Sequence, residues 1–262
     1  MYPLSGMLRG LPHGRGSHYI EGDMEQTITV TLNGKEVTAT EGESILDIAR
    51  RTHVYIPTLC HNDALEPYAA CRMCLVEIEQ RGRTRLVTSC NYYPSDGLVI
   101  TTDTERVVST RNVILELLMA RASGNREVQK LADRLGMSET RFKKVGDDCI
   151  LCGMCVRACS EVVGVDAIGF QNRGISRMPT TPYMDPSETC IGCGSCVYVC
   201  PTGYLTMEDK DGIRTIKNWK VELKLVQCKE CGEYFATERL VQFLKEKKGL
   251  PEAIADVCEY CR

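Results

Sequence analysis

Apolar and polar residues alternate twice within residues 27–40, and Asn33-Gly34 separates the two alternating runs. A period of two predicts half-buried strands, and Asn-Gly is a preferred pair for the two-residue turn of a hairpin. The next segment, 43–49, has helical spacing, and Ser44 stands where an N-cap residue is expected. A hairpin followed directly by a helix is the expected start of a β-grasp domain.

The hydrophobic pattern predicts further strands and helices along the chain. Strands are expected at 75–78 and 86–89. Helices are expected over Glu105–Arg121, over 126–135 and, near the C-terminus, over 237–247. The first of these helices should bury an apolar stripe of Val107, Val108, Ile114, Leu115, Leu117 and Leu118.

Cysteine is the residue type that stands out in the composition, with 16 among 262 residues. The first residues lack the apolar stretch of a secretory signal, and the most apolar run, 113–120, is too short to span a bilayer. We therefore expect a soluble cytoplasmic chain, without membrane insertion, whose cysteines bind metal. The formal charge of -3 gives no electrostatic reason to expect a nucleic-acid partner.

Two copies of the pattern C-x2-C-x2-C-x3-C lie within residues 149–200, and Pro201 follows the second copy. This repeat is typical of a ferredoxin with two [4Fe–4S] clusters, in which the fourth cysteine of each motif binds the other cluster. Zinc usually binds two separated cysteine pairs, and disulfides do not explain the spacing. The predicted ligands are Cys149, Cys152, Cys155 and Cys200 for the first cluster, and Cys159, Cys190, Cys193 and Cys196 for the second.

An earlier cysteine set has one close pair and two distant members: Cys60, Cys71, Cys74 and Cys90. Four thiolates in this arrangement suit a [2Fe–2S] cluster, although the spacing between the first two differs from that of plant-type ferredoxins. Zinc is the alternative metal. His61 follows Cys60, and because four cysteines are already present, we expect His61 beside the site or facing solvent.

The last cysteine set consists of two C-x2-C pairs: Cys228, Cys231, Cys258 and Cys261. Gly232 and the aromatic Phe235 follow the first pair, and this pattern is typical of a zinc ribbon. A third [4Fe–4S] cluster is the alternative, because sites with four sulfur ligands accept either metal.

Three short segments resemble the N-terminal part of the large iron–sulfur subunit of respiratory complex I. They are Thr-Leu-Cys-His at 58–61, Ala-Cys-Arg-Met-Cys-Leu-Val-Glu at 70–77 and Cys-Ile-Leu-Cys-Gly at 149–153. These segments are equally similar to the diaphorase iron–sulfur subunit of NAD-reducing hydrogenases and to iron–sulfur subunits of electron-bifurcating hydrogenases. Many members of that family carry an additional cluster held by one His and three Cys, but residues 91–148 contain neither residue type.

The resemblance implies an α+β protein with a [2Fe–2S] β-grasp ferredoxin domain, a helical connector and a two-[4Fe–4S] ferredoxin domain. A small zinc-ribbon-like C-terminal part completes the predicted chain. The expected parts are a flexible leader at 1–23, the β-grasp domain at 24–103, the connector at 104–145, the ferredoxin-like domain at 146–212 and the four-cysteine ribbon at 213–262.

The same resemblance implies a non-catalytic electron-transfer subunit of an NAD(H)-linked complex. Its expected partners are an NADH-oxidising flavoprotein and a terminal reductase or hydrogenase, with electron bifurcation and a soluble ferredoxin partner as further options. The sequence lacks a glycine-rich nucleotide-binding motif, so flavin and NAD are expected on partner chains.

Three other functions are compatible with parts of the sequence. The chain could be the iron–sulfur subunit of a succinate dehydrogenase-like complex, a catalytic subunit that reduces a substrate at an exposed cluster, or a structural zinc module. The complete cysteine sets argue against the catalytic subunit, because an open iron site usually has a missing or replaced cysteine. The sequence does not identify the terminal acceptor.

Overall fold

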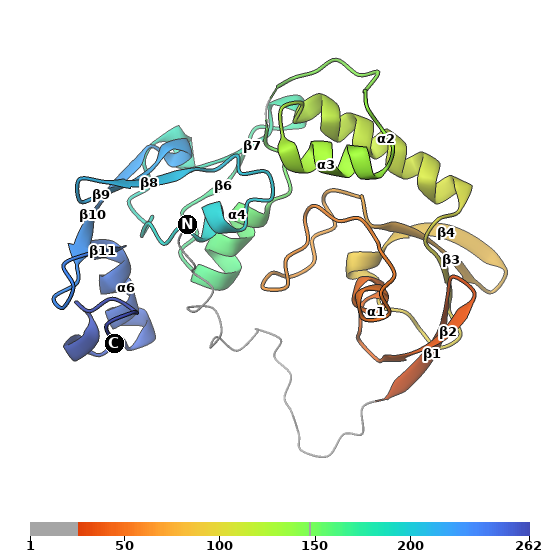
Figure 1. The fold of residues 1–262 in the computed structure, drawn as a ribbon, viewed down its shortest axis with the longest axis horizontal. Coiled ribbons are helices and arrows are strands. Elements are labelled where there is room, and N and C mark those ends of the chain that lie inside the picture. The colour runs from red at the N-terminus through yellow and green to blue at the C-terminus, as the bar shows by residue number, and fades with distance from the viewer. Residues whose placement is uncertain (1–25, 147) are drawn as a thin grey trace.

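The computed structural model describes residues 26–146 and 148–262, and the predicted leader at 1–23 lies outside them. A five-stranded mixed sheet in the order β2-β1-β5-β3-β4 forms one end of the molecule, with α1 packed against it (Figure 1). Its elements are β1 (Thr27–Leu32), β2 (Lys35–Thr40), α1 (Ile45–Arg51), β3 (Leu75–Gln80), β4 (Arg83–Thr88) and β5 (Val99–Thr101). β1 and β5 run parallel, and the other neighbours are antiparallel. This is the β-grasp arrangement that the hairpin and helix predicted.

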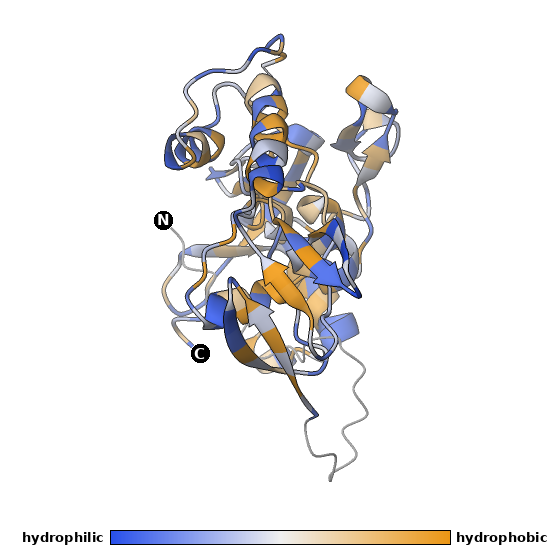
Figure 2. Ribbon diagram, turned by 90° about the vertical axis from the view of Figure 1, so that its right-hand side faces the viewer, coloured by the Kyte–Doolittle hydropathy of each residue, from blue (hydrophilic) through white to orange (hydrophobic). Residues whose placement is uncertain are grey.

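The first hairpin and α1 form as the sequence pattern predicts. Asn33 and Gly34 have positive φ angles of 49° and 78°, as the tight turn requires. The Ser44 side chain accepts a hydrogen bond from the backbone N–H of Asp47 and so caps α1. Apolar and polar positions alternate along the strands (Figure 2). The fully buried side chains between sheet and helix include Val30, Ile45, Ile48, Ile78 and Ile100.

Two helices connect this sheet to the next part of the chain. They are α2 (Glu105–Arg121) and α3 (Arg126–Arg134), and they lie above the sheet in Figure 1. The α2 boundaries match the prediction. α3 is followed by Gly136 at a φ of 72°, the conformation that ends many helices.

The prediction of the buried face of α2 was partly wrong. Val108 and Leu117 were expected in the apolar stripe, but they are 44% and 51% exposed. Four of the five buried positions instead lie four residues apart, at Val107, Arg111, Leu115 and Met119, and the fifth is Ala120. One of these four is an arginine, so hydrophobicity alone could not identify the face that packs inward.

The segment that contains the two repeated cysteine motifs has little regular structure. The third cysteine of each motif lies on a short helix, Cys155 on α4 (Met154–Arg157) and Cys196 on α5 (Ser195–Tyr198). A π-helical turn, Ala158–Val163, follows α4. Between the motifs, β6 (Gly169–Gln171) pairs antiparallel with β7 (Met178–Thr180).

A four-stranded antiparallel sheet follows, in the order β11-β10-β9-β8. Its elements and the helix after it are β8 (Met207–Lys210), β9 (Ile213–Ile216), β10 (Val221–Gln227), β11 (Tyr234–Thr237) and α6 (Glu238–Lys248). Thr237 caps α6. The predicted boundary between 146–212 and 213–262 falls in the turn between β8 and β9, so the sheet includes strands from both predicted parts.

The buried residues form several apolar cores that follow one another along the molecule. The first lies within the β-grasp sheet, and the second lies beneath α2 and α3. The third lies beneath the C-terminal sheet, and the fourth lies around α6. In the described part of the chain, no helix is long and apolar enough to cross a bilayer.

Candidate metal centres

Cys60, Cys71, Cys74 and Cys90 lie together, and none is more than 5% exposed. Cys74 directly precedes β3 and Cys90 closely follows β4. Because these strands pair with Leu75 opposite Thr88, both cysteines lie at the same end of the hairpin. The long loop before β3 supplies the other two, and the Cys71 backbone N–H lies 3.3 Å from the Cys60 sulfur.

The thiols of this set form two hydrogen-bonded pairs. A hydrogen bond from the Cys71 side chain lowers the pKa of Cys60 to about 6, and one from Cys90 lowers the pKa of Cys74 to about 6. The same two hydrogen bonds raise the pKa of Cys71 and Cys90. The four side chains therefore form two hydrogen-bonded pairs in a buried site, and a bound cation would replace the protons that they share.

A hollow in the next segment is lined by four cysteines from both repeated motifs. They are Cys149, Cys152, Cys155 and Cys200. Burial raises the pKa of Cys152 to about 12 and also raises that of Cys155. Thiols held neutral in this way need a bound cation before they ionise at neutral pH.

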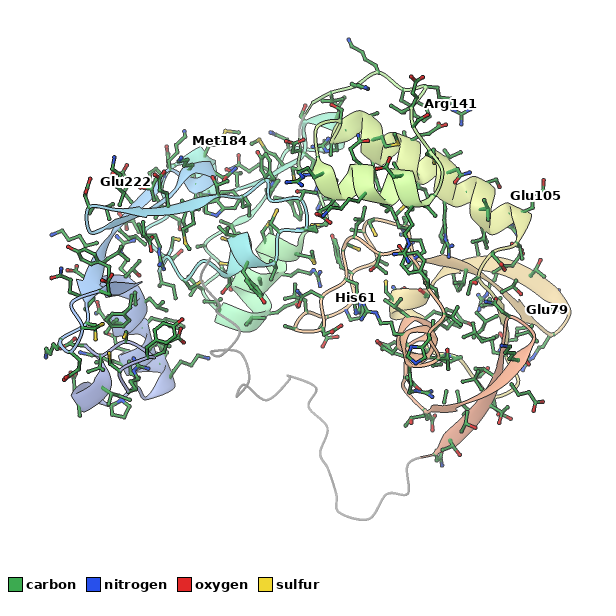
Figure 3. The ribbon with its side chains drawn as sticks, in the orientation of Figure 1. His61, Glu79, Glu105, Arg141, Met184 and Glu222 are labelled. Carbon is green, nitrogen blue, oxygen red and sulfur yellow. The ribbon has the colours of Figure 1, made fainter. Side chains whose placement is uncertain are left out.

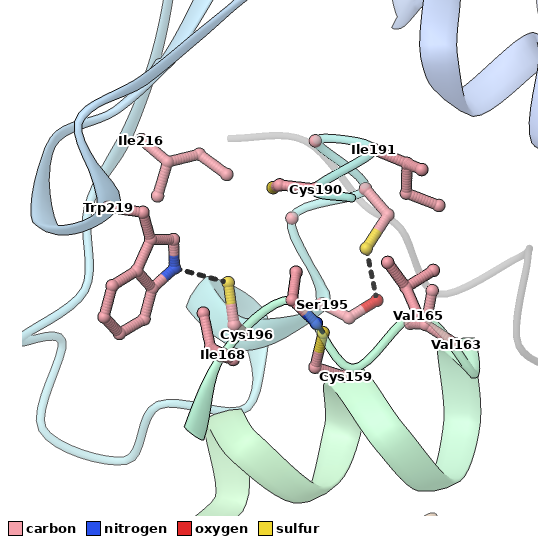
Figure 4. A pocket seen from close by; sticks show the side chains of 14 residues that line it. Cys159, Val163, Val165, Ile168, Cys190, Ile191, Ser195, Cys196, Ile216 and Trp219 are labelled. Atoms are coloured by element: carbon pink, nitrogen blue, oxygen red, sulfur yellow. Dashed lines mark hydrogen bonds between the residues drawn. The ribbon is translucent and has the colours of Figure 1, made fainter. Parts of the chain in front are cut away.

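A second hollow is lined by Cys159, Cys190, Cys193 and Cys196 (Figure 4). Its other walls are mainly apolar and include Ile168, Ile191 and Ile216. The Ala167 backbone N–H donates to the Cys159 sulfur at 3.2 Å. Burial raises the pKa of Cys196 to about 12. The fourth cysteine of each motif thus lines the hollow that contains the first three cysteines of the other motif.

The C-terminal sheet closes one side of the second hollow. The Trp219 indole N–H donates to the Cys196 sulfur at 3.4 Å, as Figure 4 shows. Arg214 is buried, pairs with Asp209 at 2.7 Å and donates to the Gly192 carbonyl at 2.9 Å. These contacts fix the loop that carries three of the four cysteines.

The sulfurs of Cys228, Cys231, Cys258 and Cys261 all lie within 4.8 Å of one another. The Cys231 and Cys258 sulfurs are 3.8 Å apart. Tetrahedral zinc with bonds of about 2.3 Å places its sulfurs about 3.8 Å apart. The thiolates of a cubane bind four separate irons and lie farther from one another. No other set of His, Cys, Asp or Glu side chains converges this closely within residues 26–146 and 148–262.

The loop of the first cysteine set contacts the first repeated motif directly. Arg157 on α4 donates to the Glu66 carbonyl, and the Glu66 backbone N–H donates to Glu161 at 3.1 Å. The Tyr68 ring lies against Gly153, where an added Cβ would come within 3.4 Å of it. Cys60, Cys71 and Cys152 belong to one apolar core. The two sites are therefore joined by packed protein.

His61 lies on this loop, which reaches from the β-grasp sheet toward α4 (Figure 3). Its side chain is 8% exposed, so it does not face solvent. Nε2 lies 3.1 Å from the Asp63 carboxylate, and Nδ1 is buried without a hydrogen-bond partner. His61 therefore lies beside the Cys60 site, which is one of the two positions expected from the sequence.

The residues fit iron–sulfur groups at three of the four sites. None of the sixteen cysteines, all of which lie within the described residues, forms a disulfide. The three sets are enclosed by apolar side chains, and backbone N–H groups point at their sulfurs. Such N–H groups stabilise the negative charge of cluster sulfurs. The compact fourth set fits a single tetrahedral ion.

Two family descriptions match the chain. "2Fe-2S iron-sulfur cluster binding domain" matches residues 25–105, and "4Fe-4S dicluster domain" matches residues 148–204 and 189–233. The chain carries both kinds of iron–sulfur domain. They occur in the predicted order, and together they include all three sets of predicted iron–sulfur ligands.

The relatives belong to redox enzymes. The chain is 35% identical over 205 residues to an NADH-quinone oxidoreductase chain of Rhizobium meliloti (strain 1021), and the match covers 68% of this chain and 24% of the relative. It is 34% identical over 210 residues to NADP-reducing hydrogenase subunit HndD of Solidesulfovibrio fructosivorans, over 68% of this chain and 36% of the relative. The chain therefore matches about a quarter to a third of these relatives' length.

A solved structure shares the fold. It is an NAD+-reducing [NiFe]-hydrogenase in the H2-reduced state, with a TM-score of 0.52 and 28% sequence identity. The match covers 59% of this chain and 74% of the hydrogenase chain. Iron–sulfur subunits of NADH-linked oxidoreductases and hydrogenases are thus homologues of this chain, as the cysteine motifs and neighbouring segments predicted.

Sequence reasoning missed two residues that contact the cysteine sites. Trp219 lies beyond the repeated motifs, and Arg111 lies on a helix expected to bury apolar side chains. The isolated Trp, the single one in the sequence, was a usable signal. No local pattern indicated Arg111.

Proposed function

We propose that the chain is an electron-transfer subunit of an NAD(H)-linked oxidoreductase or hydrogenase complex. It would hold one [2Fe–2S] cluster at Cys60, Cys71, Cys74 and Cys90. One [4Fe–4S] cluster would bind Cys149, Cys152, Cys155 and Cys200, and the other Cys159, Cys190, Cys193 and Cys196. The protein's part is to supply thiolates, N–H donors and apolar cover, while the bound clusters exchange single electrons.

The observation that carries this proposal is that neighbouring apolar cores contain cysteines from successive sites. Cys74 and Cys90 lie in the first core, whereas Cys60 and Cys71 lie in the second together with Cys152. Cys155 lies in the third core with Cys190 and Cys196. The second core therefore joins the first site to the second, and the third core joins the second site to the third. We infer a linear route from the [2Fe–2S] site through the first [4Fe–4S] site to the second, or the reverse.

The partners follow from the relatives. NADH-quinone oxidoreductase, NADP-reducing hydrogenase and NAD+-reducing [NiFe]-hydrogenase are the activities in the relatives' names. We propose that an NADH-oxidising flavoprotein docks at one end of the route and a terminal reductase or hydrogenase at the other. Flavin and NAD would be bound by those partners, and electron bifurcation or a soluble ferredoxin partner would extend the same scheme.

For the C-terminal set we propose one structural zinc ion. The 3.8 Å distance between the Cys231 and Cys258 sulfurs supports a single tetrahedral ion over a cubane. Two of the four thiols, Cys231 and Cys261, are exposed. The zinc site would hold β11 and α6 in place. Thr237, the last residue of β11, and Arg239, in the first turn of α6, donate to the carbonyls of Ile191 and Cys190 beside the second hollow.

The experiment that tests the electron-transfer proposal is Cys196→Ser, compared with the matched variant Tyr198→Phe on the same short helix. Tyr198 is 56% exposed, so removal of its hydroxyl should leave all cluster signals unchanged. Cys196→Ser should remove one [4Fe–4S] signal from the electron paramagnetic resonance spectrum and interrupt NADH-driven electron flow, while the [2Fe–2S] signal remains. An unchanged iron content in Cys196→Ser would contradict the ligand assignment.

A further inference from the structure

Arg111 is a charged residue in a row of apolar positions. It lies on the buried face of α2, one turn before Leu115 and two turns before Met119, and it is 7% exposed. Leu115 and Met119 belong to the apolar core that also contains Cys60 and Cys71. The face of α2 that carries Arg111 therefore packs toward the first cysteine set.

The guanidinium is anchored at this set through the backbone. Its Nη2 group donates to the carbonyl oxygen of Leu75, the residue that follows Cys74. Its Nε atom is buried without a hydrogen-bond partner. Within residues 26–146 and 148–262 no acidic side chain forms an ion pair with Arg111.

The charges around Arg111 point to the cysteine set as its partner. Burial lowers the pKa of Arg111, and the Cys74 thiolate is the strongest of the anionic groups that oppose this shift, ahead of Tyr55 and Asp103. Asp103 is exposed to solvent, which screens its charge. Arginine nevertheless remains protonated in proteins, so this is a permanent buried cation.

A buried cation is tolerated when an anion lies close to it and is strongly unfavourable otherwise. Two ferric ions, two sulfides and four thiolates leave a [2Fe–2S] site with a net negative charge, and reduction adds one more negative charge. A nearby cation therefore stabilises the reduced form more than the oxidised form. This raises the reduction potential of the site.

We propose that Arg111 is the counter-charge of the first cysteine set and holds the reduction potential of its [2Fe–2S] cluster above the value that the four thiolates alone would give. The inference rests on the proposed function, because it requires a redox-active cluster at Cys60, Cys71, Cys74 and Cys90. Arg111 is a positioning residue, since it touches the Leu75 carbonyl and acts on the cluster through its charge. It would thereby set how readily the first station of the route accepts an electron.

Two variants separate the charge of Arg111 from its hydrogen bond. Arg111→Gln removes the charge and keeps a donor for the Leu75 carbonyl. Arg111→Lys keeps the charge and loses the planar guanidinium group with its several N–H donors. Arg106→Gln is the matched control on the same helix. The Arg106 side chain is 57% exposed and pairs with Glu77 at 3.2 Å, so its charge is largely screened by solvent.

The measurement is a redox titration of the [2Fe–2S] signal in the complete chain, followed by electron paramagnetic resonance. Arg111→Gln should change the ratio of reduced to oxidised cluster at least tenfold toward the oxidised form, which is a shift of about 59 mV to lower potential. Arg111→Lys should shift the potential much less than Arg111→Gln. Arg106→Gln should leave the potential unchanged.

Equal shifts in the Gln and Lys variants, or no shift in Arg111→Gln, would overturn the proposal while leaving the cluster itself in place. If Arg111→Gln does not retain the cluster, the iron contents of the Gln and Lys variants test the proposal instead. Retention by Arg111→Lys with loss in Arg111→Gln supports a charge requirement, and loss in both variants overturns it. Absence of a [2Fe–2S] signal in the unmodified chain would instead contradict the proposed function.

Discussion

The indole N–H of Trp219 lies 3.4 Å from the sulfur of Cys196, and both side chains are buried. A hydrogen bond to a ligating sulfur stabilises the more negative, reduced state of a cluster. Trp219→Phe should therefore lower the potential of the second [4Fe–4S] site by about 40 mV, which corresponds to about 1 kcal/mol for one electron. Redox titration of each cluster signal tests this prediction.

The other two clusters serve as internal controls for Trp219→Phe, because their cysteines line different sites. Their potentials should stay within error of the unmodified chain. Tyr198→Phe provides a second control near the same hollow. A shift of all three potentials would show that the substitution changes the fold rather than one hydrogen bond.

Gly192 is predicted to be intolerant of a side chain. An added Cβ would lie 2.6 Å from Leu223 Cδ1 and 2.8 Å from Thr237 Cγ2, and the φ angle is 67°. Gly192→Ala should therefore destabilise the chain by about 1–3 kcal/mol more than a glycine substitution without such contacts, because overpacking forces its neighbours apart. Chemical unfolding of cluster-loaded protein measures the difference.

Gly136→Ala is the matched control for that experiment. Gly136 has a similar φ of 72°, but nothing lies within 4 Å of its added Cβ. Both variants then share the backbone strain of a left-handed residue, but Gly192→Ala alone of the two also has the steric clash. Equal loss of stability in the two variants would contradict close packing of the C-terminal sheet on the second cysteine loop.

Zinc binding at the C-terminal set should weaken as the pH falls. The hydrogen bond with Cys258 raises the pKa of Cys261 to about 12, so this thiol carries a proton at pH 7 and must release it when zinc binds. Although a backbone N–H from Glu233 opposes the shift, a hydrogen bond with Cys228 raises the pKa of Cys231, so this thiol must also release a proton. A backbone N–H from Cys258 lowers the pKa of Cys228 to about 6, so Cys228 takes up a further proton below that pH. Affinity should fall at least about tenfold per pH unit below pH 8 and more steeply below pH 6.

Competition with a chromophoric chelator at several pH values measures this dependence. Cys258→Ser should abolish tight zinc binding and leave the iron content unchanged, which separates the two kinds of site. A zinc affinity that is independent of pH, or loss of iron in place of zinc in Cys258→Ser, would contradict a zinc ion at this set.

The sequence was sufficient for features that depend on nearby residues. The first hairpin follows from alternation and Asn33-Gly34, and the boundaries of α2 follow from helical spacing. The grouping of the repeated cysteines into two hollows follows from a spacing whose chemistry is well constrained.

The sequence was insufficient where contacts join distant segments. Trp219 and Cys196 are twenty-three residues apart, and Arg111 reaches Leu75 over thirty-six. The prediction for the buried face of α2 was partly wrong because a buried charge is acceptable only beside an anion, which no helical pattern reveals. The predicted boundary falls between β8 and β9 and so divides a hairpin, although the Asp211-Gly212 turn was a local signal for that pairing.

The most direct test of the account is the amount of iron, acid-labile sulfide and zinc per chain in protein purified without oxygen. One [2Fe–2S] cluster, two [4Fe–4S] clusters and one structural ion predict about ten irons, about ten sulfides and one zinc. About fourteen irons without zinc would make the C-terminal set a further cluster. Zinc in the absence of iron and sulfide would contradict the proposal that this chain transfers electrons.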